Sequence, residues 1–236
     1  MPTTHLVDSL VRAPYWLGSR LRRARMFHPR GIAFAARLHL TGEGPLPTGE
    51  HACLVRLSKA LGTPGDLPDI LGVGLRLEVD GEPVDVLAAT CAGFDGWRRL
   101  VLWPVASWST ARLSSLMAWE SEDGARAQVL METADPGLPS PDVRALAHRL
   151  PVRLRVRVVG RHGDLQTGAL VVEGPRVQPV DFDPVLHHPR GWRLVPDWLA
   201  SARASAYDAS RNARPDTVGP GRSVRAGRAR GGSSSR

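Results

Sequence analysis

Apolar residues alternate with polar or small residues in several short segments of this chain. The clearest case is the alternation of Leu71, Val73, Leu75, Leu77 and Val79, which predicts a strand with one buried face. The other strands predicted in this way are 31–41, 51–58, 84–90, 99–103, 125–132, 152–158 and 169–173. Several antiparallel strands favour a closed or nearly closed β-barrel, because closure removes exposed strand edges.

Three segments have helical spacing instead, which makes the predicted class α+β, a barrel with peripheral helices. Residues 109–119 are predicted to form a helix with Ser109 as the N-cap. Residues 141–150 are predicted to form another, which starts at Ser140-Pro141. The last helix is predicted at 196–214, where no proline interrupts the segment before Pro215 ends it.

The same patterns divide the chain into three parts. Residues 1–24 mix apolar and basic positions and are expected to form an N-terminal arm or short helix. Residues 25–214 carry the predicted elements and suffice for one domain of ordinary size. Residues 215–236 have almost no apolar side chains, so we expect a disordered basic tail.

The net charge of +8 suggests a polyanionic partner, but half of this excess lies in the tail. The tail contains Arg222, Arg225, Arg228, Arg230 and Arg236 against the single acid Asp216. Such a tail gives at most weak, salt-sensitive attraction to polyanions. It contains no aromatic residue that could stack on bases, which disfavours nucleic-acid binding.

Cysteine content and hydropathy indicate the cellular compartment of the protein. The two cysteines, Cys53 and Cys91, are too few and too far apart for a zinc motif, and they favour a reducing compartment. The N-terminal residues lack the uninterrupted apolar run of a signal peptide. No apolar run approaches the length of a membrane span. We therefore expect a cytoplasmic protein.

The helix predicted at 196–214 carries candidate chemistry. At about 100° per residue, Arg203, Tyr207, Arg211 and Arg214 project from one stripe. Neighbouring cations and a ferric ion both favour the ionised phenol, and a phenolate is a sound axial ligand for haem iron. Arginines could also pair with haem propionates. Taken alone, such a stripe in an arginine-rich protein is more often a solvated helix face than a cofactor site.

Two N-terminal segments resemble motifs of the catalase core. Residues 25–31, Arg-Met-Phe-His-Pro-Arg-Gly, resemble R-V-V-H-A-[KR]-G, and residues 55–58, Val-Arg-Leu-Ser, resemble V-R-F-S. The first resemblance implies that His28 is the distal catalytic histidine, with Arg25 and Met26 beside the haem. The second implies that Ser58 orients His28 and that Arg56 pairs with a propionate.

Two later segments resemble catalase motifs in the same order. Residues 69–77 resemble D-x-R-G-F-A-x-K-F and are followed by residues 85–90 in place of D-L-V-x-N-N. The last helix resembles R-x-x-x-Y-x-D-T-x-R-x-x-R, after a Phe182-Asp183-Pro184 that resembles F-[ND]-P. This similarity implies that Tyr207 is the axial ligand of haem b. It also implies haem contacts from a second set of residues, namely Phe94, Arg203, Arg211 and Arg214.

The chain departs from the catalase pattern in two ways. Thr90 stands where catalases have an asparagine that helps to position peroxide, and threonine offers one hydroxyl donor with a shorter reach. The separation between His28 and Tyr207 is much shorter than in full-length catalases, and residues 98–180 match no catalase motif. The chain therefore resembles the minimal barrel of catalase-related peroxidases and of allene-oxide-synthase-like proteins.

The resemblance implies a peroxidase that uses hydrogen peroxide or an organic hydroperoxide and an unknown electron donor, with weak catalase activity and Thr90 as a third catalytic residue. By analogy, residues 1–24 could join copies of the chain into a homo-oligomer. A non-enzymatic haem-binding or haem-sensing protein is the first alternative. A basic nucleic-acid-binding barrel without haem is the second. A metal-dependent hydrolase built on His187-His188 has less support, because these residues lack ligand spacing.

Overall fold

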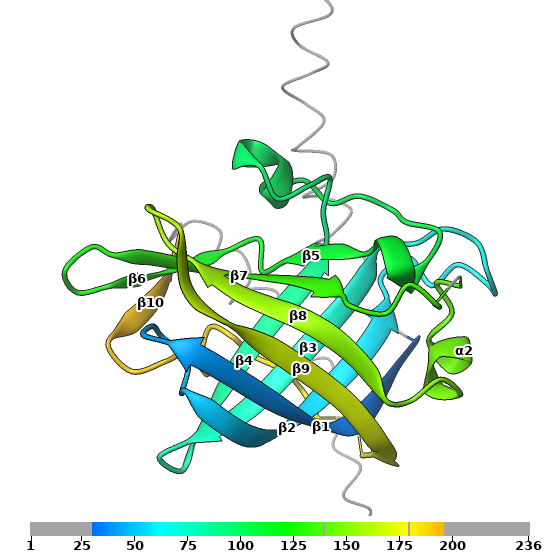
Figure 1. Cartoon of the computed structure of the whole chain (residues 1–236), viewed down its shortest axis with the longest axis horizontal. Coiled ribbons are helices and arrows are strands. Elements are labelled where there is room, and N and C mark those ends of the chain that lie inside the picture. The colour runs from blue at the N-terminus through cyan, green and yellow to red at the C-terminus, as the bar shows by residue number, and fades with distance from the viewer. Residues whose placement is uncertain (1–29, 139, 179, 196–236) are drawn as a thin grey trace, which may run out of the picture.

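Eight antiparallel strands close into a barrel in the computed structural model, which describes residues 30–138, 140–178 and 180–195 (Figure 1). The barrel strands are β1 (Arg30–Gly42), β2 (Gly49–Lys59), β3 (Leu71–Val79), β4 (Glu82–Thr90), β5 (Arg112–Ser114), β7 (Arg126–Thr133), β8 (Val152–Val159) and β9 (Asp164–Val177). They pair in this order around the barrel, and β9 returns to β1. The predicted antiparallel barrel is confirmed.

The remaining elements are short and peripheral. Two strands, β6 (Ala118–Ser121) and β10 (Trp192–Val195), extend the sheet beyond β7. The described helical elements are the 3-10 turns η1 (Gly96–Leu100) and η2 (Trp108–Thr110) and the α-helix α2 (Val143–Ala147). The helix predicted at 141–150 is therefore present but shorter. Its N-cap is Asp142, whose carboxylate accepts a 3.0 Å hydrogen bond from the amide of Arg144.

Inward side chains fill the barrel. Leu38 on β1, Leu57 on β2, Leu75 on β3 and Leu170 on β9 are completely buried. Each such side chain contributes about 1.5–3 kcal/mol through burial. Strand β9 also passes very close to β1 at Gly168, where an added Cβ would lie 1.8 Å from the carbonyl oxygen of His39. Only glycine permits this approach.

The hairpin of β3 and β4 fixes the register of the strands that carry the site. Asp80 and Gly81 form its turn, with φ angles of 53° and 81°. Two positive φ angles are typical of the two-residue turns that join antiparallel strands. The turn pairs Val79 with Glu82 and thus places Arg76 opposite Asp85.

Two predicted elements are wrong. Residues 109–119 form η2, β5 and the start of β6 instead of a helix, because β5 pairs with both β4 and β7 across the barrel seam. This pairing overrides the helical spacing of the apolar residues. Residues 99–103 form no ladder strand. Residues 99 and 100 are the end of η1, and the remaining three contribute only the isolated bridge between Cys91 and Leu102.

The predicted end segments lie outside the described residues. These segments are the arm at 1–24, the late helix at 196–214 and the basic tail at 215–236. No helix among the described residues is long and apolar enough to cross a membrane.

Candidate functional site

Small side chains cover one end of the outer face of β1–β4. Strand register places Gly31, Ser58, Gly72 and Ala89 in one row across the four strands. We call this set the Ser58 row. Ser58 is only 2% exposed, and its hydroxyl donates a 3.3 Å hydrogen bond to the carbonyl oxygen of Gly72. The row therefore forms a flat surface with one hydroxyl group.

A cation lies beside this surface. Arg56 occupies the next outward position of β2, and its side chain extends over Gly31, where an added Cβ would lie 2.4 Å from Arg56 Nε. Burial lowers the pKa of the Arg56 guanidinium from its ordinary value, and the charge of Asp181 acts in the opposite direction. The guanidinium remains charged at neutral pH, since arginine is deprotonated only at far higher pH.

A buried ion pair closes the other end of this face. Asp85 on β4 is fully buried and accepts hydrogen bonds from Arg76 Nε at 2.7 Å and from Arg76 Nη2 at 2.6 Å. The bond to Asp85 is the main reason why the pKa of Arg76 is raised. A bidentate pair of this kind is the strong geometry for arginine and carboxylate.

The segment 181–187 is fastened to this ion pair. Oδ2 of Asp85 also accepts hydrogen bonds from the amide of Asp183 at 2.7 Å and from Nδ1 of His187 at 2.8 Å. Arg76 Nη2 donates to the carbonyl oxygen of Asp181 at 2.6 Å. We call these residues, Arg76, Asp85, Asp181, Asp183 and His187, the clamp.

Phe182 packs under the clamp and against the sheet. Its ring lies over Gly74, where an added Cβ would be 3.2 Å from two ring carbons, and Arg76 Cζ lies 5.5 Å from the ring centroid. A larger residue at Gly74 would displace the ring. The Phe182-Asp183-Pro184 motif therefore has a structural role, because it covers the outer face at Gly74, the residue that pairs with Arg56.

Thr90 lies on the other face of the sheet. It lies on the same inward face of β4 as the core residues Val84, Val86 and Ala88 and is completely buried. Its hydroxyl accepts a 3.1 Å hydrogen bond from the amide of Leu71 and donates a 2.7 Å bond to the carbonyl oxygen of Trp103. The outward position of β4 in the Ser58 row belongs to Ala89 instead. Thr90 is thus turned away from the face on which a catalytic role was predicted for it.

Solved structures share this architecture. The chain superposes on a bacterial catalase with a TM-score of 0.53, 14% identity and coverage of 89% of this chain and 61% of that chain. The fold is catalase-like. A fungal catalase gives a TM-score of 0.53 at 15% identity, with 87% of this chain and 62% of that chain covered. Catalase A from Saccharomyces cerevisiae gives a TM-score of 0.56 at 12% identity, with 87% of this chain and 63% of that chain covered.

The similarity is confined to the fold. The chain spans about three fifths of the length of the catalases that it matches. No protein-family model matches the sequence, and no curated protein matches it either. Of the predicted resemblance to catalases, the catalase-like barrel fold is therefore confirmed.

The predicted site residues divide into two groups. Within the catalase-like barrel, Ser58 and Arg56 lie together on the outer face, Thr90 is buried on the inner face, and Phe94 is half-buried in the loop after β4. The others lie outside the described residues: Arg25, Met26, His28, Arg203, Tyr207, Arg211 and Arg214. In the described part of the chain, no group of three or more His, Cys, Asp or Glu residues could hold a metal ion.

The clamp is the feature that the sequence interpretation missed. In the sequence, Asp85 and Phe182-Asp183-Pro184 stand out only as motif matches, and His187 only as one of two histidines without ligand spacing. The sequence does contain a signal for the contact between Arg76 and Asp85, because a two-residue turn at Asp80-Gly81 places these two residues opposite each other. No local pattern points to the contribution of His187, whose partner Asp85 is 102 residues away in the chain.

Proposed function

We propose that this chain is a haem b-binding peroxidase that reduces hydrogen peroxide or an organic hydroperoxide. The observation that carries the proposal is the combination of the flat Ser58 row with Arg56 on the outer face of a catalase-like barrel. The proposal includes the minimal architecture of catalase-related peroxidases, since the chain spans only part of the catalases that it matches.

The described residues fit a planar group with anionic substituents. No side chain in the Ser58 row is larger than serine, and the row crosses four strands, a width of roughly 14 Å at normal strand spacing. Arg56 provides the cation for a carboxylate at one side of this surface. Phe182, which covers Gly74 beside Arg56, and the clamp exclude solvent from the adjoining part of this face.

When bound, haem supplies the iron centre at which the peroxide bond is cleaved. The chain's own residues would hold and protonate the reactants. His28 transfers a proton between the two peroxide oxygens as general acid and base. The Ser58 oxygen donates to Gly72 and can still accept a hydrogen bond, so it can fix the ring of His28 through an imidazole N–H.

The remaining predicted residues complete the cofactor site in this proposal. Tyr207 would hold the iron through its phenolate oxygen, and Arg203 would stabilise that charge. Arg25, Arg211 and Arg214 join Arg56 in pairing with propionates, while Met26 and Phe94 provide apolar contacts. Reduction of R–OOH to R–OH and water consumes two protons and two electrons, and an organic donor supplies the electrons.

The decisive experiment is the visible spectrum of the full chain expressed with haem supply. We expect a high-spin ferric tyrosinate spectrum that is lost in Tyr207→Phe. Tyr15→Phe is the matched control, since Tyr15 is the only other tyrosine in the chain, and its spectrum should equal that of the wild type. Colourless protein with an intact β-sheet circular dichroism spectrum would disprove the proposal. It would then favour a haem-free barrel whose nucleic-acid affinity is lost on deletion of 216–236.

A non-enzymatic haem-binding or haem-sensing protein is the second candidate, and one observation favours it. The Ser58 row has Ala89 at its β4 position, and the hydroxyl of Thr90 forms its hydrogen bonds inside the barrel. Ser58 therefore supplies the only side-chain hydroxyl in the row. Stopped-flow mixing with peroxide separates the two candidates. Rapid oxidation of an added donor that is lost in His28→Gln supports the peroxidase, whereas slow bleaching of the haem alone supports the binding protein.

A further inference from the structure

Exposed apolar side chains gather at one end of the barrel. Among the described residues, six large apolar side chains are more than half exposed, and only Leu186 lies elsewhere. The other five, which we call the apolar rim, are Leu61 (64%), Leu67 (56%), Trp97 (71%), Leu100 (55%) and Trp103 (56%). Clustered exposed apolar residues mark interaction surfaces, whereas single ones do not.

The two loops of the apolar rim are joined to each other. Backbone hydrogen bonds of 3.1 and 2.9 Å link Asp69 and Val105 in both directions. The buried carboxylate of Asp69 also accepts 2.8 Å bonds from the amides of Leu61 and Thr63. On the other loop, Trp103 is held by the hydroxyl of Thr90. Hydrogen bonds therefore hold both loops of the apolar rim in place.

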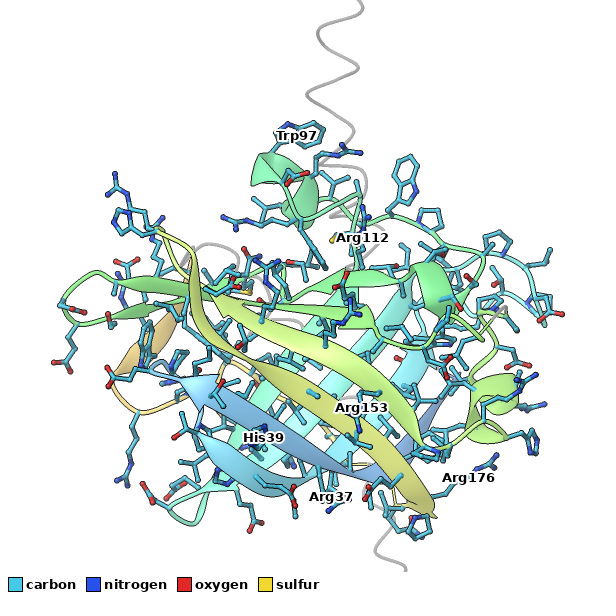
Figure 2. All side chains as sticks on the ribbon, viewed as in Figure 1. Arg37, His39, Trp97, Arg112, Arg153 and Arg176 are labelled. Atoms are coloured by element: carbon cyan, nitrogen blue, oxygen red, sulfur yellow. The ribbon has the colours of Figure 1, made fainter. Side chains whose placement is uncertain are left out.

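The turn η1 gives the rim an amphipathic tip. None of its residues is buried, and it projects beyond the barrel with Trp97 directed outward (Figure 2). Residues three apart lie on the same side of a 3-10 turn, so Trp97 and Leu100 share one edge. Arg98 and Arg99 flank this edge, and Arg112 lies at its base. No salt bridge within the described part of the chain involves these three arginines.

We propose that the apolar rim docks on the surface of an anionic lipid bilayer. Indole and leucine side chains at a projecting tip suit the boundary between headgroups and acyl chains, where tryptophan is favoured. The guanidinium groups of Arg98 and Arg99 stand where they can bind lipid phosphates. A projecting tip of this kind enters a bilayer surface more readily than it forms the broad, flat contact of a stable dimer.

Co-sedimentation of the full chain with sucrose-loaded vesicles tests this proposal. The chain should bind vesicles of phosphatidylcholine and phosphatidylglycerol more tightly than vesicles of phosphatidylcholine alone, and less tightly as salt rises. Trp97→Ala/Leu100→Ala should lose about tenfold or more in affinity, since both apolar side chains leave the interface. Leu186→Ala is the matched control and should bind like the wild type. Arg98→Gln/Arg99→Gln should reduce the preference for the anionic vesicles.

Three outcomes would overturn the proposal. Unchanged binding by Trp97→Ala/Leu100→Ala would assign the affinity to other basic residues, such as those of 216–236. Absence of binding by the wild-type chain would exclude the bilayer. A solution dimer that dissociates in Trp97→Ala/Leu100→Ala, without vesicle binding, would assign the rim to an interface between copies. Haem content plays no part in these measurements, so they stand apart from the test of the peroxidase.

Discussion

The outer face of strand β1 changes character halfway along its length. The outward residues of the first half are Gly31, Ala33 and Ala35, all small and buried or half-buried. Those of the second half, Arg37, His39 and Thr41, are polar and exposed. The inward residues show no such change, because Phe34 and Leu40 are both almost completely buried.

This difference separates the requirements of the barrel from those of the site. Every part of the barrel needs apolar inward residues, so these indicate only that a strand is present. Small outward residues are needed only where another group covers the sheet. In the second half, Arg37 instead forms solvent-exposed ion pairs with Glu50 and Glu173. The outward positions therefore locate the candidate site on a uniform barrel.

The largest expected effect tests whether water is excluded from the barrel interior at the middle of β1, where the outer face changes from small to polar residues. Cys53 is the inward partner of Ala36 on β1, and burial raises its pKa to about 12. At pH 8 its thiolate fraction, and hence its rate of reaction with DTNB, should be roughly three orders of magnitude below that of a free cysteine. The measurement uses Cys91→Ser, so that Cys53 is the only thiol.

The same raised pKa predicts how stability depends on pH. Folded Cys53 keeps a proton that the unfolded chain releases above about pH 9, so the contribution to the free energy of unfolding falls between pH 9 and pH 12. Cys53→Ser should flatten this part of the profile. Rapid DTNB reaction of native Cys53 would show instead that water reaches the interior at this level.

The next largest effect contrasts a buried ion pair with an exposed one. Asp85→Asn removes the charge that binds Arg76 and should lower the free energy of unfolding by about 3 kcal/mol, because the mostly buried Arg76 cation loses its fully buried partner. Asp164→Asn breaks the exposed pair with Arg157 and should cost less than about 1 kcal/mol. Denaturant titrations of the two variants provide the comparison. Equal losses would contradict a structural role for the clamp.

A smaller effect compares the two halves of β1 directly. Gly31→Leu places a side chain where Arg56 Nε lies and should cost about 2 kcal/mol through overpacking. His39→Leu introduces the same residue on the exposed half and should change stability by no more than about 0.5 kcal/mol. Thermal unfolding of both variants measures the difference. If the first half of β1 accepts leucine as readily as the second, the outer face is not covered there.

The smallest effect concerns the exposed ion pairs. Arg37→Ala removes contacts to Glu50 and Glu173, but all three side chains are at least one-third exposed. We expect a small loss of stability at low salt that disappears at high salt, because solvent and ions screen these charges. Chemical unfolding at two ionic strengths measures it. A loss that persists at high salt would show that this half also depends on specific contacts.

The barrel could be predicted because its strands satisfy a simple rule. Strands such as 71–79 and 152–158 alternate between the interior and the outside, so period two suffices to find them. The helix predicted at 109–119 fails because Leu113 and Met117 also fit a helical period. Only pairing of β5 with β4 and β7, which are distant in sequence, decides between the two structures.

The site could be predicted in part for the same reason. Arg56 and Ser58 are two residues apart on one strand, so alternation alone places them on one face. The same rule applied to Val86, Ala88 and Thr90 would have placed Thr90 inside the barrel. Asp183 and His187 could not be placed in this way, because a loop brings them to Asp85 from about 100 residues away.

The pairing of β1 with β9 has a consequence for synthesis of the chain. Gly42 pairs with Gln166, and Ala33 with Val177, so β1 gains its second neighbour only after β9 has been translated. At ordinary elongation rates, roughly ten seconds separate the two strands on the ribosome. During that interval one edge of β1 lacks its native partner. Nascent chains shorter than about 180 residues should therefore be the species that most need a chaperone.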